Sequence, residues 1–388
     1  MKTIYLDNAA TTPVDEKVFL AMKPYFSEKF GNASSLHQKG QEAKMALEES
    51  REIIAKSINA KPDEIIFTSG GTESNNLAIK GLAFVYPNKK HIIISKIEHD
   101  CVLNACKFLE SRGYKITYLN VDFDGFIDLK QLEKAITKDT LLVSIIHGNN
   151  EIGTIQDLEA IGKICKEKKI FLHTDACQSY TKTLIDVKKQ NLDLVTLNAH
   201  KIHGPKGVGA LYLREGIKIV PIAHGGGHEK NRRSGTENIP SIVGFAEAVK
   251  IANPENIKKI SRLRDKLISG LEKIPGSKLN GPKGEKRLAN NVNFSFKGVE
   301  GESVGGYLDA EGICSSTGSA CSSKSLEPSH VLLAIGLTPE QAHGSLRLSL
   351  SKNNTEEEID IVLEKLPKII EKLRKISPIE KIVNKLIK

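Results

Sequence analysis

The run IFLHTDACQSYTKTLIDVKKQNLDLVTLNAHKIHGPKG, residues 170–207, contains two short apolar segments that each end in polar residues. The segments 170–176 and 194–199 are rich in β-branched residues and almost free of charge. This composition is typical of strands that are covered on both faces, as in a parallel sheet between helices. Asp175 closes the first segment and Lys201 follows the second. We therefore predict that both lie at the carboxyl edge of one sheet, where open α/β sheets bind ligands.

Further apolar runs on either side of this stretch are predicted to be strands of the same sheet, at 64–69, 91–95, 116–121, 141–146 and 208–213. Helical patterns separate several of them: SNNLAIKGLAFV (74–85), CVLNACKFLES (101–111) and DLEAIGKICKEKK (157–169). This alternation predicts an α/β fold with a mostly parallel sheet and helices on both faces. From about residue 241 the chain changes to longer charged helices, a second short α/β stretch and a basic amphipathic helix, so we expect two domains.

The composition indicates a folded protein and argues against membrane-spanning and nucleic-acid-binding classes. Of 388 residues, 39% are hydrophobic and 27% charged, which is ordinary for a folded protein. No run approaches the roughly 18 apolar residues of a membrane helix, and no signal peptide is recognisable, so we expect a cytoplasmic protein without a membrane partner. The net charge of +9 comes largely from lysines scattered through helices, without the aromatic-interleaved patch of single-strand binders. We therefore expect no direct nucleic-acid partner.

The cysteines are too sparse for a disulfide scaffold, and none forms a C-x-x-C pair that would suggest a zinc ribbon. Reduced cytosolic thiols leave room for a working nucleophile among them. The six are Cys101, Cys106, Cys165, Cys177, Cys314 and Cys321.

Three strand ends carry residues suited to one ligand. SGGTESNN (69–76) joins two glycines to a helix start, which makes either an anion cradle or a plain tight turn. Asp175, with Gln178 close behind, needs a partner at a buried strand end or else caps the next helix. Lys201, beside His200, is suited to forming a Schiff base, although the sequence alone is equally consistent with an ordinary surface lysine. Together they meet the needs of pyridoxal phosphate: an anchored phosphate, a protonated ring nitrogen and an amine for the aldehyde.

The chain resembles the class V, fold-type I pyridoxal-phosphate enzymes, specifically the NifS/IscS-type cysteine desulfurases, nearly from end to end. One shared motif would be weak evidence, but many in the same order make coincidence improbable. The motifs are YLDNAATTP (5–13), GNASSLH (31–37), TSGGTESNNLAIKG (68–81), EHDCVL (98–103), NNEIG (149–153), HTDACQ (173–178), AHKIHGPKG (199–207), HGGGHEKNRRSGTEN (224–238), SSTGSACSS (315–323), LEPSHVLLAIG (326–336) and SLRLSLSK (345–352).

The resemblance implies a large cofactor-binding domain at 14–258 and a small α/β domain made of 1–13 and 259–388. It also implies roles: Lys201 forms the Schiff base, Asp175 faces the pyridine nitrogen, and His99 stacks on the ring and carries protons. Arg347 is expected to bind the substrate carboxylate as a bidentate fork. The other expected contacts are Gly71, Thr72, Asn198 and His200 at the phosphate, Asn150 and Gln178 at the phenolic oxygen, and Thr236 at the phosphate of the neighbouring subunit, which implies a homodimer.

The segment 313–325, ICSSTGSACSSKS, is rich in serine and glycine and is predicted to be a mobile loop. Such a loop suits a thiol that attacks inside the site and then delivers its cargo outside. Cys321 matches the persulfide-forming cysteine of the family, whereas Cys314 is expected to be a small core residue. No resident metal is expected, and Cys321 stays open as a transient iron–sulfur ligand shared with a scaffold partner.

Two positions depart from the family pattern. Asn198 stands where serine is usual, which predicts rearranged phosphate anchoring, because an amide still donates a hydrogen bond. Ala33 replaces a proline in GNASS, which should loosen a loop near the substrate.

The resemblance implies that the enzyme converts L-cysteine to L-alanine and a Cys321 persulfide, and delivers the sulfur to a protein acceptor for iron–sulfur assembly. Sulfur supply for transfer-RNA thiolation is the alternative destination. A selenocysteine lyase or another β-eliminating relative would not need Cys321. An aminotransferase lacks support for a second, dicarboxylic substrate, and a sulfur carrier without catalysis is disfavoured because Lys201, Asp175 and His99 are all present.

Overall fold

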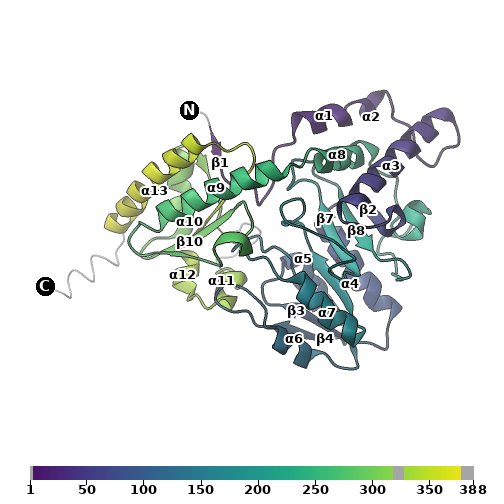
Figure 1. Cartoon of the computed structure of the whole chain (residues 1–388), viewed down its shortest axis with the longest axis horizontal. Helices are drawn as coiled ribbons and strands as arrows, with labels where there is room; N and C mark the ends of the chain where they lie inside the picture. The colour runs from purple at the N-terminus through teal and green to yellow at the C-terminus, as the bar shows by residue number, and fades with distance from the viewer. Residues whose placement is uncertain (1–2, 318–326, 377–388) are drawn as a thin grey trace.

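The computed structural model describes residues 3–317 and 327–376. Figure 1 shows two α/β layers lying side by side, joined by helix α9 (Pro254–Leu271). We call the part around the seven-stranded sheet, on the right, the large layer, and the part that contains the C-terminal third of the chain the small layer.

The sheet of the large layer has the strand order β2-β8-β7-β6-β5-β3-β4. The neighbours from β7 to β4 are parallel, and β8 runs antiparallel to both of its neighbours. All seven strands predicted from the apolar runs are confirmed, as is the mostly parallel sheet. Their bounds are β2 Ile65–Thr68, β3 His91–Ser95, β4 Lys115–Leu119, β5 Thr140–Ser144, β6 Phe171–Asp175, β7 Leu194–Asn198 and β8 Gly209–Leu213.

Helices cover both faces of this sheet, which explains why its strands are apolar without alternation. On β3, Ile93 packs into one hydrophobic cluster while Ile92 and Ile94 pack into the opposite one. The first cluster contains residues of α1 (Glu16–Met22), α3 (Gln38–Ser57), α6 (Leu129–Ala135), α7 (Leu158–Lys168) and α8 (Ile239–Lys250), and α2 (Pro24–Ser27) lies beside α1. The second contains residues of α4 (Gly71–Val85) and α5 (Asp100–Glu110).

The small layer has its own core, to which Ile4 and Leu6 at the start of the chain contribute together with residues from Ile260 to Leu373. Its antiparallel sheet has the order β12-β10-β9, and the N-terminal strand pairs with β11 in parallel. The elements are β1 Ile4–Tyr5, β9 Ser277–Leu279, β10 Asn291–Phe296, α10 Gly301–Ala310, β11 Ile313–Cys314, α11 His330–Ala334, α12 Pro339–His343, β12 Ser345–Ser349 and α13 Glu356–Ile376.

Helices α11 and α12 pack on the large layer through a separate apolar cluster. Val331 and Leu332 of α11 lie in it with Ile97 and Ile152, which follow strands of the large sheet. Ser329 caps α11 by accepting a hydrogen bond from the N–H of Leu332 (3.3 Å). The chain that follows segment 318–326 is therefore fixed against the wall of the large layer.

Several expectations have clear outcomes. The three helical patterns quoted above became α4, α5 and α7. The expected loop 313–325 begins with structure instead: Ile313 and Cys314 form β11, and Ser316 pairs with Arg347, because these residues find backbone partners on β1 and β12. Cys321 lies outside the described residues, and the domain bounds at 14–258 stay a prediction. Within residues 3–317 and 327–376, no helix is long and apolar enough to cross a bilayer.

Candidate active site

A cavity of about 380 Å³ lies where β3, β5, β6 and β7 end, and residues of both layers line it. The structure thus brings together residues that are spread over the whole sequence. Of the predicted site residues, Gly71, Thr72, His99, Asn150, Asp175, Gln178, Asn198, His200, Lys201 and Arg347 line this cavity.

The start of helix α4 forms one end of the cavity. Gly71 is the first helical residue, and a Cβ there would lie 2.6 Å from Sγ of Cys177, so only glycine fits without displacement. The free N–H groups and positive end of a helix favour a bound anion. Nearby, Asn198 is buried, and its Nδ2 lies 3.8 Å from the position that a Cβ at Gly71 would take, so its amide donor lies beside the start of the helix.

Asp175 ends strand β6 and is almost wholly buried. Burial opposes ionisation, but the nearby His99 and hydrogen bonds from Cys177 and Asn75 outweigh it and hold the pKa of this carboxyl below its usual value. Nδ2 of Asn75 donates to Oδ2 (2.7 Å), and the N–H of Cys177 donates to Oδ1 (2.9 Å). The cavity therefore contains a fixed carboxylate.

His99 caps helix α5, and this contact determines which ring nitrogen carries the proton. Nδ1 accepts a hydrogen bond from the N–H of Cys101 (3.2 Å). The neutral ring therefore has its proton on Nε2. Burial lowers the pKa of His99, so the neutral form is favoured.

Lys201 follows β7, and a second lysine lies directly behind it. Nζ of Lys182 donates to the carbonyl oxygens of Lys201 (3.1 Å) and Gln178 (2.9 Å). Burial, together with the positive charge of Lys201, lowers the pKa of Lys182 to about 7. The backbone that carries Lys201 is thus held from behind, while Lys201 itself lines the cavity.

Arg347 reaches the cavity from β12 of the small layer. Its Nη2 donates to Oδ1 of Asp7 (2.9 Å) and its Nη1 to the carbonyl oxygen of Asn150 (3.2 Å). Its Nε is buried without a partner among the described residues. The guanidinium therefore keeps donor capacity for a carboxylate.

Of four further predicted residues, two have contacts at the cavity, one does not line it, and one lies outside the described residues. The side chain of Gln178 donates to the carbonyl oxygen of Ala9 (2.8 Å). Nδ1 of His200 lies 3.2 Å from Oγ1 of Thr11, and burial lowers the pKa of His200 to about 4, so this ring is neutral. Thr236 does not line the cavity. Cys321 is not among the described residues.

These residues fit pyridoxal phosphate. The amide donor of Asn198 lies beside the start of α4, the Gly71 position admits no side chain, and a carboxylate and a lysine lie in the same cavity. This donor set matches an anchored phosphate, a protonated ring nitrogen and a bound aldehyde.

Comparison with known families agrees with this chemistry. The aminotransferase class-V family matches residues 4–362. The chain belongs to this family. It is therefore an enzyme, and its cofactor is pyridoxal 5′-phosphate.

Individual relatives of this class-V enzyme point the same way. It is 55% identical over 382 residues to the cysteine desulfurase IscS of Dictyoglomus turgidum, which covers 97% of each chain. Among solved structures, a NifS-like protein matches 95% of this chain and 99% of its own with a TM-score of 0.90 at 41% identity. A structure of SspA in complex with cysteine matches 91% of this chain and 100% of its own, with a TM-score of 0.83 at 42% identity.

The class-V cavity also contains residues that sequence reasoning missed. Glu98 and Glu151 are buried carboxyl groups beside the predicted His99 and Asn150, and Ser329 and His330 come from the small layer. Glu98 and Glu151 lie in the motifs EHDCVL and NNEIG, and each follows an apolar run in the sequence. An acidic residue at such a position could have been recognised as a candidate site residue. The hydrogen bond between Ser329 and Glu151 joins residues 178 positions apart, and no local sequence pattern predicts it.

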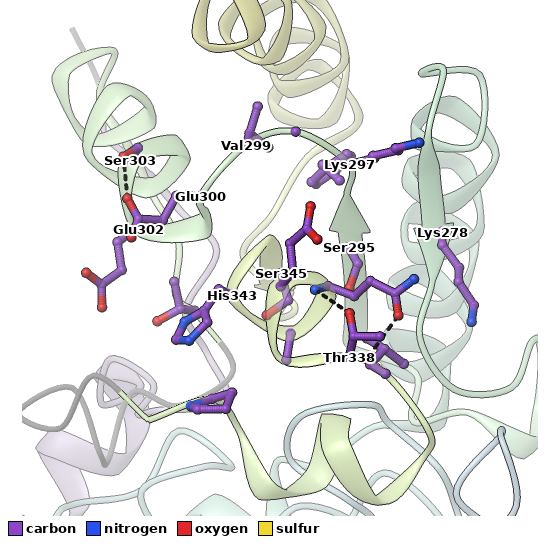
Figure 2. Close-up of a pocket in the computed structure, with 18 of the residues that line it drawn as sticks. Lys278, Ser295, Lys297, Val299, Glu300, Glu302, Ser303, Thr338, His343 and Ser345 are labelled. Carbon is purple, nitrogen blue, oxygen red and sulfur yellow. Dashed lines mark hydrogen bonds between the residues drawn. The ribbon is translucent and has the colours of Figure 1, made fainter. Parts of the chain in front are cut away.

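A larger cavity of about 1080 Å³ is lined by residues of the small layer. Figure 2 shows Glu300, Glu302 and His343 on one side of it and Lys278 on the other. None of the predicted cofactor residues lines it, so the smaller cavity is the candidate active site of this class-V enzyme. Ser329 borders both cavities.

Proposed function

We propose that this class-V enzyme is a cysteine desulfurase, which converts L-cysteine to L-alanine and leaves the sulfur as a persulfide on Cys321. The observation that carries the proposal is the meeting of Lys201, Asp175 and Arg347 in one cavity. An amine, a carboxylate and a guanidinium are what a pyridoxal-phosphate enzyme needs for an amino-acid substrate. The identity to IscS proteins and the cysteine-bound SspA structure support cysteine as that substrate.

The cofactor contacts follow from the cavity. Gly71, Thr72, Asn198 and His200 would hold the phosphate, and Asn150 and Gln178 the phenolic oxygen. Asp175 would keep the ring nitrogen protonated and Lys201 would hold the aldehyde. When bound, pyridoxal phosphate supplies an electron sink that weakens the bonds at the substrate α-carbon.

The chain's own residues orient the substrate and move its protons. Arg347 binds the carboxylate with the donors that Asp7 and Asn150 leave free. His99 holds a proton on Nε2, and it can deliver this proton inside the cavity. Lys201, when its amine is free, would be the second proton carrier.

Cys321 is proposed as the sulfur acceptor because its place in SSTGSACSS matches the family's persulfide cysteine. Its thiolate would attack the substrate sulfur. The described chain on either side of segment 318–326 supports access to the cavity. Ser316 is paired with Arg347, and Ser329 lines the cavity wall.

We further propose a homodimer in which Thr236 contributes to the phosphate site of the neighbouring subunit. Large apolar side chains on and beside α1, α2 and α3 are exposed, which is unusual for a monomer surface. Leu36 is 92% exposed and Phe30 is 66% exposed, and Phe19, Leu20, Phe26 and Met45 are also exposed. A second copy would bury them.

The domain division at 14–258, with 1–13 and 259–388 forming the small domain, is also proposed. The separate core that joins Ile4 and Leu6 to residues beyond Ile260 supports it.

The sulfur is proposed to pass in the cytoplasm to an iron–sulfur scaffold protein, with Cys321 a transient ligand during transfer. Identity of 52% to an IscS of Methanosarcina thermophila, over 97% of this chain, supports this choice. Co-purification with a transfer-RNA thiolation protein alone would instead assign the alternative destination.

One assay tests the enzymatic proposal. Purified yellow protein is given L-cysteine and a reductant, and alanine, sulfide and the mass of the Cys321 peptide are followed. We expect one alanine per sulfide and, without reductant, one additional sulfur atom on Cys321. Full turnover by a Cys321→Ser variant would reject the persulfide and assign a lyase.

A further inference from the structure

A continuous row of hydrogen bonds joins Asp175 to His99 through Asn75 and Cys101. Nδ2 of Asn75 donates one hydrogen to Oδ2 of Asp175 (2.7 Å) and the other to Sγ of Cys101 (3.0 Å). Sγ of Cys101 in turn lies 3.0 Å from Nδ1 of His99. Asp175, Cys101 and His99 line the cavity, and Asn75 is buried behind them. The row links two proposed cofactor contacts through two residues to which the proposed function gives no role.

The direction of the contact between Cys101 and His99 follows from the backbone. His99 caps α5, and its Nδ1 accepts a hydrogen bond from the N–H of Cys101 (3.2 Å). Because this nitrogen is an acceptor, the thiol beside it donates its own hydrogen to the same lone pair. Burial raises the pKa of the Cys101 thiol to about 12, so this hydrogen is present at neutral pH.

We propose that Cys101 is a positioning residue for His99, and that its S–H group keeps the ring neutral, with the proton on Nε2. The inference rests on the proposed function, in which His99 carries protons beside the cofactor. Two donors on Nδ1 oppose the addition of a proton there, because a hydrogen bond that only the neutral ring can accept favours the neutral ring. Asn75 supports this arrangement by donating to Sγ, which leaves the thiol hydrogen for His99.

Several titratable groups also act on the charge of His99. Those that face His99 or Cys101 are Glu98 after β3, Asp100 on α5, Asp175 on β6, Lys201 after β7 and His330 on α11. Burial is the largest effect and lowers the pKa of His99, and Lys201 and His330 act in the same direction. Asp175 and Asp100 act against them and favour the protonated ring. The thiol hydrogen bond therefore adds to burial at a ring that two carboxylates pull the other way.

A nucleophilic role suits Cys101 less well. The thiolate is the competent nucleophile, and burial raises the pKa of Cys101 too far for a useful thiolate fraction at neutral pH. Burial likewise raises the pKa of Cys177, the other thiol that lines the cavity among the described residues. Both groups are therefore thiols that can donate or accept hydrogen bonds but do not compete for the substrate sulfur.

Substitutions at this position separate hydrogen bonding from packing. Cys101→Ser keeps a donor and an acceptor, whereas Cys101→Ala removes both and leaves only the backbone N–H. Cys101→Val also removes the donor but fills a similar volume, so it serves if the alanine variant is unstable. Cys106→Ala is the packing control, because Cys106 is buried on the same helix within the apolar cluster of α4 and α5.

The experiment observes the ring of His99 directly in holoenzyme that contains isotope-labelled histidine. Nitrogen NMR distinguishes a ring nitrogen that carries a proton from one that does not, and a His99→Gln sample identifies the signals of His99. A pH titration then gives the midpoint at which the ring becomes protonated. The visible cofactor band and the melting temperature first confirm folded, loaded protein, and turnover of L-cysteine is measured separately.

We expect wild-type His99 to carry its proton on Nε2 at neutral pH. In Cys101→Ala and Cys101→Val the midpoint should rise by at least about half a pH unit, the size expected for one lost hydrogen bond to the neutral ring. Cys101→Ser and Cys106→Ala should titrate close to wild type.

Three results would overturn the inference: a proton on Nδ1 in wild type, an unchanged midpoint in Cys101→Ala and Cys101→Val, or a rise of the same size in Cys101→Ser or Cys106→Ala. The readout does not use L-cysteine, so it is independent of the reaction. If the midpoints shift as expected but wild-type enzyme forms no alanine from cysteine, the proposed function fails while the role of Cys101 stands.

Discussion

Individual groups in the cavity are set to opposite protonation states by their immediate contacts. Hydrogen bonds from Cys177 and Asn75 help to keep Asp175 ionised, whereas burial keeps Glu98 protonated. Oε2 of Glu98 has no partner among the described residues. One carboxylate and one carboxylic acid therefore share a single small cavity, as enzymes that need both an acid and a base require.

Gly71 gives a prediction at this scale. Gly71→Ala places a Cβ 2.6 Å from Sγ of Cys177 at the start of α4, which must push the helix end away from the proposed phosphate site. We expect the affinity for pyridoxal phosphate, measured by titration of the apo protein, to fall at least about tenfold, which is about 1.4 kcal/mol.

Gly306→Ala is the control for this substitution. Gly306 lies inside α10, and a Cβ there meets nothing within 4 Å. Alanine in an open helical position should stabilise the protein by about 0.5–1 kcal/mol and leave cofactor affinity unchanged. Equal affinities of the two variants for pyridoxal phosphate would contradict a phosphate site at the start of α4.

At the scale of elements, the segment before α8 is held by one buried ion pair. Glu229, in the 3₁₀ turn His228–Asn231, accepts from Nη2 of Arg51 on α3 (2.7 Å) and from the N–H of Phe67 on β2 (2.8 Å). Glu229 and its two successors all have positive φ, a conformation that non-glycine residues rarely adopt. The pair therefore keeps a strained turn in place only a few residues before Thr236.

We expect Glu229→Gln to reduce the free energy of unfolding by about 3 kcal/mol, because it removes the buried partner of Arg51 and leaves only the half-exposed Glu48 (3.1 Å) as its counter-charge. Urea unfolding measures this. Glu215→Gln is the control, since the Lys61–Glu215 pair is largely exposed and should contribute at most about 1 kcal/mol. A loss for Glu229→Gln as small as that of the control would contradict the structural role of the turn.

Helices and strands could be predicted from the sequence where a local pattern of apolar residues identified them. The continuous apolar run at His91–Ser95 identified a strand covered on both faces, and the pattern at 157–169 identified α7. Asp175 and Lys201 were predicted because they follow such strands, whereas the roles of His99 and Arg347 came from the family resemblance. The bond between Ser329 and Glu151 and the ion pair between Asp7 and Arg347 were not, because they join distant positions through packing of the two layers.

At the scale of the whole molecule, buried histidines make stability depend on pH. Burial lowers the pKa of both His147 and His173 to about 4. In the unfolded chain these groups titrate near 6.5, so between about pH 6.5 and 4 the unfolded state binds more protons. Stability is therefore complete above this window and falls as the pH is lowered through it.

Each buried histidine should contribute about 3 kcal/mol to this loss. We expect the urea midpoint of wild-type protein to fall steeply from pH 7 to pH 4, and that of His147→Leu to fall less. An unchanged pH dependence in His147→Leu would show that His147 is not the neutral buried group described here.

The proposed dimer gives a test by complementation. Lys201→Ala and Thr236→Ala variants are purified separately, unfolded, mixed and refolded together. If Thr236 serves the neighbouring subunit, the mixed dimer contains one site with both residues intact, and activity should exceed that of either parent. If Thr236 serves its own subunit, mixing restores nothing, and the shared-site proposal is wrong.

The pairing of β1 with β11 has a consequence for the timing of synthesis. Residues 4–5 leave the ribosome first, but their partners, Ile313 and Cys314, emerge more than 300 residues later, and Arg347, the partner of Asp7, later still. At about 5–20 residues per second the opening segment waits on the order of tens of seconds. Ala9 and Ala10 line the cavity just beyond that segment, so the cavity is completed only after Arg347 has emerged. A chain that ends before Arg347 therefore lacks the substrate-binding end of the proposed site and is expected to be inactive.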